Sequence, residues 1–227
     1  MTTVLLIRHG LTAMTGPVLA GWTPGVHLDD RGRAQAVALA ERLLPVPVAA
    51  IVTSPLERCA ETAAAIAQGR DVTVETDDRL GECRYGDWTG QELKKLAKDP
   101  LWKVVQAHPS AATFPGGEAL RTTQARAVDA VRAHNAALGD DATWIAVSHG
   151  DVIKAIVADA LGLHLDLFQR IQADPCSVTV IRYTPLRPFV LRLNDTGGGV
   201  DDLLPPKRRS RRRPSSDAPV GGGAGSA

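Results

Sequence analysis

The sequence predicts an α/β fold, a three-layer αβα sandwich around a mostly parallel sheet. Short apolar runs rich in β-branched residues, such as Val4–Ile7 and Ala49–Thr53, alternate with segments of helical periodicity. Strands that are separated by helices pair in parallel and carry helices on both faces of the sheet. With 227 residues, of which 44% are hydrophobic and 22% charged, the chain is long and apolar enough to bury a sizeable core.

The predicted strands are short apolar runs that precede helical or loop segments. We expect strands over 4–7, 49–53, 72–75, 143–147, 177–183 and 189–193. The run at 72–75 is polar enough to lie near an edge of the sheet, because central parallel strands are buried on both faces. The last two runs, with Pro185 and Pro188 between them, are expected to close the sheet.

The predicted helices follow start signals and apolar spacing. We expect helices over 31–44, 55–68, 90–97, 100–107, 118–138 and 151–162, and a short one over 166–171. Asp29 or Asp30 is expected to cap the first helix, and Ser54 the second, with Pro55 at its first helical position. The segments 11–30 and 79–90 are rich in loop residues, and the length of the first suggests a binding loop.

Composition divides the chain into a histidine-bearing domain at 1–194 and a tail at 195–227. The tail is mostly Gly, Pro, Ser and Arg, which predicts disorder because such residues bury little apolar surface. Its basic run at 207–213 holds six of the 26 Lys and Arg residues. A solvated charge run without a specific partner is favoured over nucleic-acid or membrane binding, and removal of 197–227 is expected to leave activity intact.

The remaining composition predicts a cytoplasmic protein. The net charge of +1 gives no general case for nucleic acid as a partner. Three cysteines, Cys59, Cys83 and Cys176, match no metal or redox spacing, which favours reduced thiols. The N-terminus runs directly into a strand without the pattern of a targeting segment, and no apolar run approaches the roughly 18 residues of a membrane span.

Chemistry-bearing side chains follow the predicted strands at one edge of the sheet. Arg8 and His9 end the first strand, His149 ends the fourth, and Arg58 lies one turn into the helix after the second. Glu82 belongs to the 79–90 loop, which can reach the same edge. Each residue alone is more often structural, but the carboxyl ends of parallel strands are where ligands bind, so the set together indicates a site.

This set of side chains suits phosphoryl transfer. Two arginines favour a dianion such as phosphate, and their charges hold a neighbouring histidine neutral, which makes it a nucleophile. A second histidine can stabilise the transferring group, and a carboxylic acid can protonate the leaving oxygen. The rival interpretation is a metal held by His9, His149 and Glu82, but Arg8 and Arg58 would repel a dication. We therefore expect no metal and no cofactor.

The motifs that contain these residues resemble the histidine phosphatase superfamily, in its phosphoglycerate-mutase-like branch. They occur in the family's order over about 145 residues, and they are Leu6–Thr12, Thr53–Arg58 with Thr62–Ala63, Leu80–Glu82 with Tyr85–Gly90, Phe114–Glu118 and Ser148–Gly150. The resemblance implies a phosphoglycerate-mutase-like fold. It implies that His9 becomes phosphohistidine, that Arg8, Arg58 and His149 form the phosphate pocket, and that Glu82 is the proton donor.

The resemblance also implies lesser contacts with the substrate. Thr12 and the backbone near Gly10 and Gly150 would contribute, and Thr15 occupies the position where the family often has an asparagine that contacts phosphate. The loops around the pocket supply candidates for the substrate rim, with loop packing as the alternative for each: Arg84, Trp22, His27, Trp88 and Phe114.

Three functions remain open at this point. A phosphatase for a small phosphorylated metabolite is favoured over a mutase, because only about two dozen residues separate Gly90 from Pro115, where the mutases carry a longer basic and aromatic insert. The loop 82–86 also lacks the mutases' histidine after the arginine. A non-catalytic phospho-ligand-binding protein is the third reading, although all five core residues are present. A homodimer is compatible with the sequence.

Overall fold

In the computed structural model, which describes residues 1–198, 220, 221 and 223, the core is a six-stranded sheet in the order β3-β2-β4-β1-β5-β6. The strands are β1 (Thr2–Arg8), β2 (Ala50–Thr53), β3 (Val74–Thr76), β4 (Thr143–Ser148), β5 (Val178–Tyr183) and β6 (Pro188–Asp195). Strands β1 to β4 are mutually parallel, while β5 runs antiparallel to β1 and β6 antiparallel to β5. The predicted fold class is confirmed.

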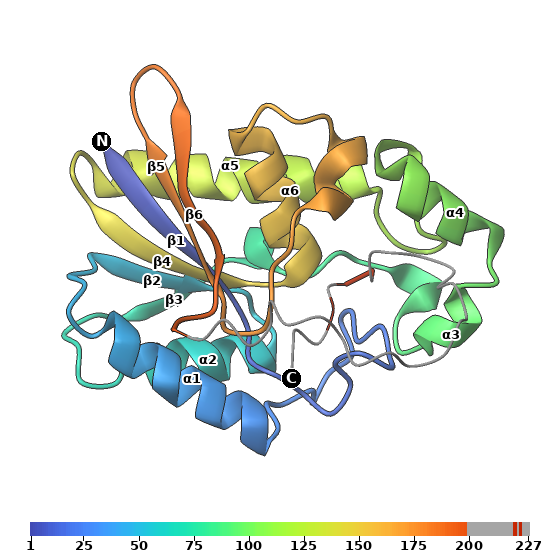
Figure 1. Cartoon of the computed structure of the whole chain (residues 1–227), viewed down its shortest axis with the longest axis horizontal. Helices are drawn as coiled ribbons and strands as arrows, with labels where there is room; N and C mark the ends of the chain where they lie inside the picture. The colour runs from blue at the N-terminus through green and yellow to red at the C-terminus, as the bar shows by residue number, and fades with distance from the viewer. Residues whose placement is uncertain (199–219, 222, 224–227) are drawn as a thin grey trace.

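Helices cover both faces of the sheet, as Figure 1 shows. They are α1 (Asp30–Leu43), α2 (Glu57–Ala67), α3 (Leu93–Leu96), α4 (Pro100–Ala107), α5 (Leu120–Leu138) and α6 (Gly150–Ala160). Leu5 and Ile7 of β1 belong to the apolar cluster under α1 and α2, whereas Val4 and Leu6 belong to the cluster under α5 and α6. This alternation of side chains along a strand produces the three layers.

Most predicted elements form within a few residues of the expected bounds. Helix α1 and strand β3 show why the sequence signals were reliable. Asp29 caps α1, its side chain accepting a hydrogen bond from the Gly32 amide at 2.8 Å. Strand β3 lies at the edge of the sheet with all its residues exposed, as its polar sequence predicts. The segment predicted as a helix at 166–171 is a 3₁₀ helix at Leu165–Arg170.

The predicted start of α2 is wrong. Helix α2 begins at Glu57, with Leu56 at the N-cap and no side-chain cap, so Ser54 and Pro55 precede the helix. The Ser54 hydroxyl instead lies 2.7 Å from Nε2 of His149. The capping residue type is therefore present, but its hydroxyl pairs with His149, the residue after β4.

The predicted tail lies mostly outside the described residues. The basic run at 207–213 is outside them, so its expected solvation stays a prediction. Strand β6 extends to Asp195, one residue into the predicted tail. Val220, Gly221 and Gly223 are described, and they lie against the sheet edge that carries His9.

Candidate active site

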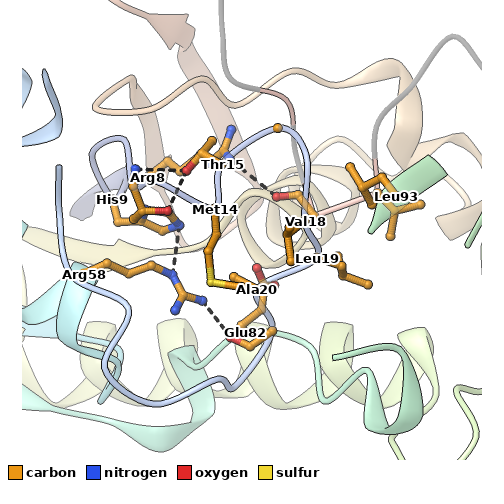
Figure 2. A pocket seen from close by; sticks show the side chains of 15 residues that line it. Arg8, His9, Met14, Thr15, Val18, Leu19, Ala20, Arg58, Glu82 and Leu93 are labelled. Carbon is orange, nitrogen blue, oxygen red and sulfur yellow. Dashed lines mark hydrogen bonds between the residues drawn. The ribbon is translucent and has the colours of Figure 1, made fainter. Parts of the chain in front are cut away.

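A pocket lies at the edge of the sheet where β1 and β2 end (Figure 2). It is lined by Arg8, the last residue of β1, and by His9, which follows it. Arg58 of α2 and Glu82 of the 79–90 loop also line it. The 11–30 segment, predicted as a binding loop, supplies much of the remaining wall. Its pocket-lining members are Thr12, Met14, Thr15, Gly16, Val18, Leu19, Ala20 and Gly21.

His9 is buried and its hydrogen bonds define one tautomer. Its Nδ1 lies 2.7 Å from the Gly10 carbonyl oxygen, which can only accept, so Nδ1 carries the proton. The Nε of Arg58 donates to Nε2 of His9 at 3.3 Å, so Nε2 holds a lone pair. Burial, Arg58 and Arg8 hold the pKa of His9 well below its usual value. His9 is therefore a neutral imidazole with its basic nitrogen toward Arg58.

The backbone after His9 is packed too closely for any side chain at position 10. A Cβ on Gly10 would lie 2.6 Å from the carbonyl oxygen of Gly32, at the start of α1. The Gly10 amide donates to the hydroxyl of Thr62 in α2 at 3.1 Å. These contacts with both helices fix the turn that holds His9. The Gly10 amide already has a hydrogen-bond acceptor within the protein, the Thr62 hydroxyl.

Two buried guanidinium groups give the pocket its positive charge. Arg58 Nη2 donates to the Gly21 carbonyl at 2.8 Å and lies 3.3 Å from Nδ1 of His149, while its Nη1 has no hydrogen-bond partner among the described residues. Arg8 Nη1 donates to the Ala173 carbonyl at 2.9 Å. Burial lowers the pKa of Arg8, and Glu82 and Asp151 oppose that shift. Both groups keep their charge, as guanidinium does in proteins.

His149 is fully buried behind His9, and the two rings meet edge to face with centroids 5.2 Å apart. Because Arg58 donates toward Nδ1, the neutral ring carries its proton on Nε2 and donates it to the Ser54 hydroxyl. Nδ1 also lies 3.7 Å from a Glu82 oxygen. Burial, followed by Arg58 and His9, holds the pKa of His149 well below its usual value.

Glu82 is a buried carboxyl group with a pKa raised to about 7. Burial is the main cause and the charge of Asp151 the second, while Arg58 opposes them. The Cys83 amide donates to one carboxyl oxygen at 3.0 Å, and the Tyr85 hydroxyl lies 3.4 Å from the same atom. A carboxyl group with this pKa can both give and take a proton near neutral pH, which acid–base catalysis requires.

Asp151 is a member of the site that the sequence did not reveal. Its side chain is buried, accepts a hydrogen bond from the Tyr85 hydroxyl at 2.9 Å, and pairs with the ammonium of Lys154 at 3.1 Å. Lys154 in turn donates to Gln169 at 2.6 Å. The useful signal was its place in the first turn of the helix after His149, where a buried carboxylate is unusual unless it is paired.

The residues predicted to make lesser contacts with the substrate divide into two groups. Thr12 and Thr15 line the pocket, and their hydroxyls lie 3.0 Å apart. The Thr12 amide donates to the Thr15 hydroxyl at 3.0 Å, so Thr15 orders the loop at the position of the family's asparagine. Gly150 is the buried first residue of α6, behind the pocket lining.

The predicted rim residues do not line this pocket. Arg84 is exposed, and its guanidinium stacks over the Trp22 ring at 3.9 Å. Trp22 donates from its indole nitrogen to the Glu82 carbonyl at 2.6 Å, so it supports the loop that carries the acid. Trp88 and Phe114 pack in the core with their rings 5.2 Å apart, and His27 is exposed and pairs with Glu61.

Within the described residues, no group of three or more His, Cys, Asp or Glu side chains is arranged to hold a metal ion. His9, His149 and Glu82 do approach one another, but Arg58 lies between them and donates to both imidazoles. The donor set is therefore arranged around a cation that belongs to the protein. All three cysteines are free and buried.

The chain belongs to the histidine phosphatase superfamily (branch 1), whose family model matches residues 4–196. The family that the motifs predict is confirmed. In the part of the chain that the structure describes, no helix is both long and apolar enough to cross a membrane.

Several characterised proteins are similar to the chain over most of its length. Phosphoserine phosphatase 1 of Hydrogenobacter thermophilus is 30% identical over 86% of this chain and 93% of its own length. The glucosyl-3-phosphoglycerate phosphatase of Mycolicibacterium vanbaalenii is 31% identical over 72% of this chain and 76% of its own. Among solved structures, Bacillus stearothermophilus YhfR matches with a TM-score of 0.78 and 30% identity over 86% of this chain and 98% of its own.

Proposed function

We propose that this protein is a phosphomonoester hydrolase that acts on a small phosphorylated metabolite through a phosphohistidine at His9. The observation that carries the proposal is the tautomer of His9. Its Nδ1–H donates to the Gly10 carbonyl oxygen, and its Nε2 offers a lone pair beside Arg58. A neutral imidazole next to two guanidinium groups is prepared to attack a phosphorus atom whose oxygens those groups hold.

In the first step, Nε2 of His9 forms a bond to phosphorus and the ester P–O bond breaks. The carboxylic acid of Glu82 gives its proton to the departing alkoxide, so the product leaves as an alcohol. Glu82 is then a carboxylate, and His9 carries the phosphoryl group on Nε2. Arg8 and Arg58 hold the negative charge of the phosphoryl oxygens throughout, because guanidinium pairs with them in fork geometry.

In the second step, water attacks the phosphorus atom and the P–N bond breaks. The Glu82 carboxylate takes a proton from this water, which restores the carboxylic acid, and inorganic phosphate leaves. A pKa of about 7 serves both steps because the two forms of Glu82 are close in free energy near neutral pH. We propose that the phosphate dianion, by offsetting the Arg58 charge that keeps His149 neutral, lets His149 take a proton from solvent on Nδ1, and that this N–H donates to the transferring group.

The region between Gly90 and Pro115 supports hydrolysis over mutase chemistry. Its four lysines, Lys94, Lys95, Lys98 and Lys103, are all exposed, and none lines the pocket. A mutase must hold a phosphorylated product at the site until the phosphoryl group returns, and a basic clamp would serve that purpose. Both similar enzymes named above are phosphatases of small phosphate esters. Three free thiols also support work in a reducing compartment such as the cytoplasm.

The test is a panel of phosphomonoesters that includes phosphoserine, 3-phosphoglycerate, sugar phosphates and nucleotides. Released phosphate and the positional isomers of phosphoglycerate are both measured, and substrates are ranked by kcat/KM. Hydrolysis of at least one metabolite is the expected result. Isomerisation of 3-phosphoglycerate without phosphate release would instead assign a mutase, and binding without turnover of any ester would assign a phospho-ligand-binding protein.

A further inference from the structure

The C-terminal residues Val220, Gly221 and Gly223, which we call the C-terminal plug, occupy the mouth of the pocket. Val220 and Gly221 line it together with Arg8, Arg58 and Glu82. The side chain of Val220 is 1% exposed and belongs to the same apolar cluster as Leu19 and Tyr85. An apolar side chain this far along the chain is thus anchored beside the predicted catalytic groups.

Hydrogen bonds hold the backbone of the C-terminal plug to the site. Arg8 Nη1 donates to the Gly223 carbonyl at 2.5 Å, and Nη2 lies 3.5 Å from the Gly221 carbonyl. The Gly221 amide donates to the buried carboxylate of Asp151 at 2.8 Å. Carbonyl oxygens therefore occupy positions on the Arg8 guanidinium that a phosphate oxygen would need.

The backbone conformation at position 221 favours glycine. Its φ is +76°, a conformation that side chains with a Cβ rarely adopt. A Cβ there would also lie 2.9 Å from Cδ1 of Leu19 and 3.7 Å from the Tyr85 hydroxyl. A larger residue at this position would adopt a strained backbone and would have to displace the Leu19 side chain.

The space left beside the C-terminal plug is too small for a phosphate ester. The cavity measures about 30 Å³, which is room for roughly two water molecules. A phosphoryl group with its ester must displace something to reach His9. The C-terminal plug lines this space, and it belongs neither to the sheet nor to a helix.

We propose that the mouth of the pocket is a peptide-binding surface whose occupant is this chain's own C-terminal plug, which competes with the phosphate ester for Arg8. Because the plug belongs to the same chain, its effective concentration at the pocket is of millimolar order, so even weak contacts give substantial occupancy. A phosphate dianion binds guanidinium more strongly than a carbonyl dipole does, so substrate displaces the plug at sufficient concentration.

The competition predicts a specific kinetic pattern. Because substrate must first displace the plug, the apparent KM of the full chain is raised. The kcat is unchanged, because the saturated enzyme no longer holds the plug in the pocket. The same competition weakens the binding of inorganic phosphate, which requires no turnover. The inference concerns the site of the proposed function, but phosphate binding tests it even if hydrolysis is not found.

The test compares the full chain with its variants Val220→Asn and Gly221→Val, using calorimetric titration with inorganic phosphate and kcat and KM for one ester. Val220→Asn removes the apolar anchor, and Gly221→Val strains the left-handed backbone and crowds Leu19. The matched control is Leu191→Asn, on the exposed face of β6 and away from the pocket. We expect both plug variants to bind phosphate about tenfold more tightly, with KM lowered by the same factor and kcat unchanged.

Unchanged phosphate affinity in both plug variants would overturn the proposal, and weaker affinity would mean that the plug helps to hold phosphate. A chain that ends at Gly198 gives a second measurement, since the family model is complete by residue 196. This shortened chain must match the plug variants in phosphate affinity. If it matches the wild type instead, the C-terminal segment does not compete for the pocket.

Discussion

Two strands of the same sheet end in His-Gly, and the structure gives the two histidines different surroundings. Strands β1 and β4 are neighbours in parallel register, with Arg8 opposite Ser148, so His9 and His149 emerge side by side. Both rings are buried, and burial with the same guanidinium groups lowers the pKa of each. Position in the fold and charge therefore do not distinguish them.

Hydrogen bonds do distinguish them. Nδ1 of His9 donates to the carbonyl oxygen of Gly10, and among the described residues Nε2 accepts a hydrogen bond only from Arg58, at 3.3 Å. In His149, Nε2 is hydrogen-bonded to the Ser54 hydroxyl, and Nδ1 lies between Arg58 and Glu82. The comparison indicates that a nucleophile needs a basic nitrogen left without a strong donor, whereas a supporting histidine is held at both nitrogens.

The largest expected effect comes from removing the proposed nucleophile. His9→Ala should lower kcat by about 10⁵-fold, because no other described residue that lines the pocket offers an imidazole lone pair. Initial rates on the best ester of the panel measure this. Retention of more than about a tenth of the wild-type rate would reassign the nucleophile, with His149 as the next candidate.

The second effect concerns the acid on the His149 side of the pocket. Glu82→Gln should lower kcat by about 10³-fold for an alkyl phosphate, because the leaving alkoxide loses its proton donor. For p-nitrophenyl phosphate, whose leaving group is already a weak base, the loss in the first step should be much smaller. Equal losses for both substrates would show that Glu82 acts through structure and not as an acid.

The pH profile follows from the same group. The first step needs protonated Glu82, whose pKa is about 7, so kcat/KM should fall as pH rises above about 7. The lowered pKa of His9 keeps the imidazole neutral on the acid side, so the acid limb should lie below pH 6.5. In Glu82→Gln the fall above pH 7 should disappear; its persistence would assign that limb to another group.

A third, smaller effect should come from the supporting histidine. His149→Gln should lower kcat by about 10²-fold, because one donor to the transferring phosphoryl group is lost. The exposed His108→Gln serves as the matched control and should change nothing. If His149→Gln is as severe as His9→Ala, the two histidines share one role and the contrast drawn between them fails.

The smallest effect should come from the hydroxyl that holds His149. Ser54→Ala should lower kcat about tenfold by releasing Nε2, and Ser54→Thr, which keeps a hydroxyl, should restore most of the activity. In the His149→Gln background, Ser54→Ala should add little, because residues that act through one contact are not additive. Full additivity of the two changes would show that Ser54 acts independently of His149.

Sequence reasoning recovered the layers and the residues around the candidate pocket because both follow from local patterns. Apolar runs that end in Arg-His or Ser-His place their polar residues at the same edge of a parallel sheet. The resemblance to a known family then supplied the role proposed for Glu82, which no strand positions. Those parts of the site depend on residue type and order alone.

The parts that sequence reasoning missed depend on contacts between distant residues. Ser54 carries the signal of a helix cap, but its hydroxyl meets His149 across 95 positions. Arg84 has the charge expected of a substrate rim, yet the ring of Trp22 holds it outside the pocket. Asp151 carried only the weak signal of its place in the first turn of α6, and Val220 carried none, because each gains its partners only when the sheet edge has assembled.

The central claim is that the phosphoryl group is transferred to His9 and not to His149. The most direct measurement is rapid quenching of the enzyme during turnover of a ³²P-labelled ester, followed by peptide mapping under alkaline conditions that preserve phosphohistidine. The account predicts acid-labile label on the peptide that contains His9, carried on Nε2, and no label in His9→Ala. Label on the peptide that contains His149, or stoichiometric label that survives in His9→Ala, would contradict it.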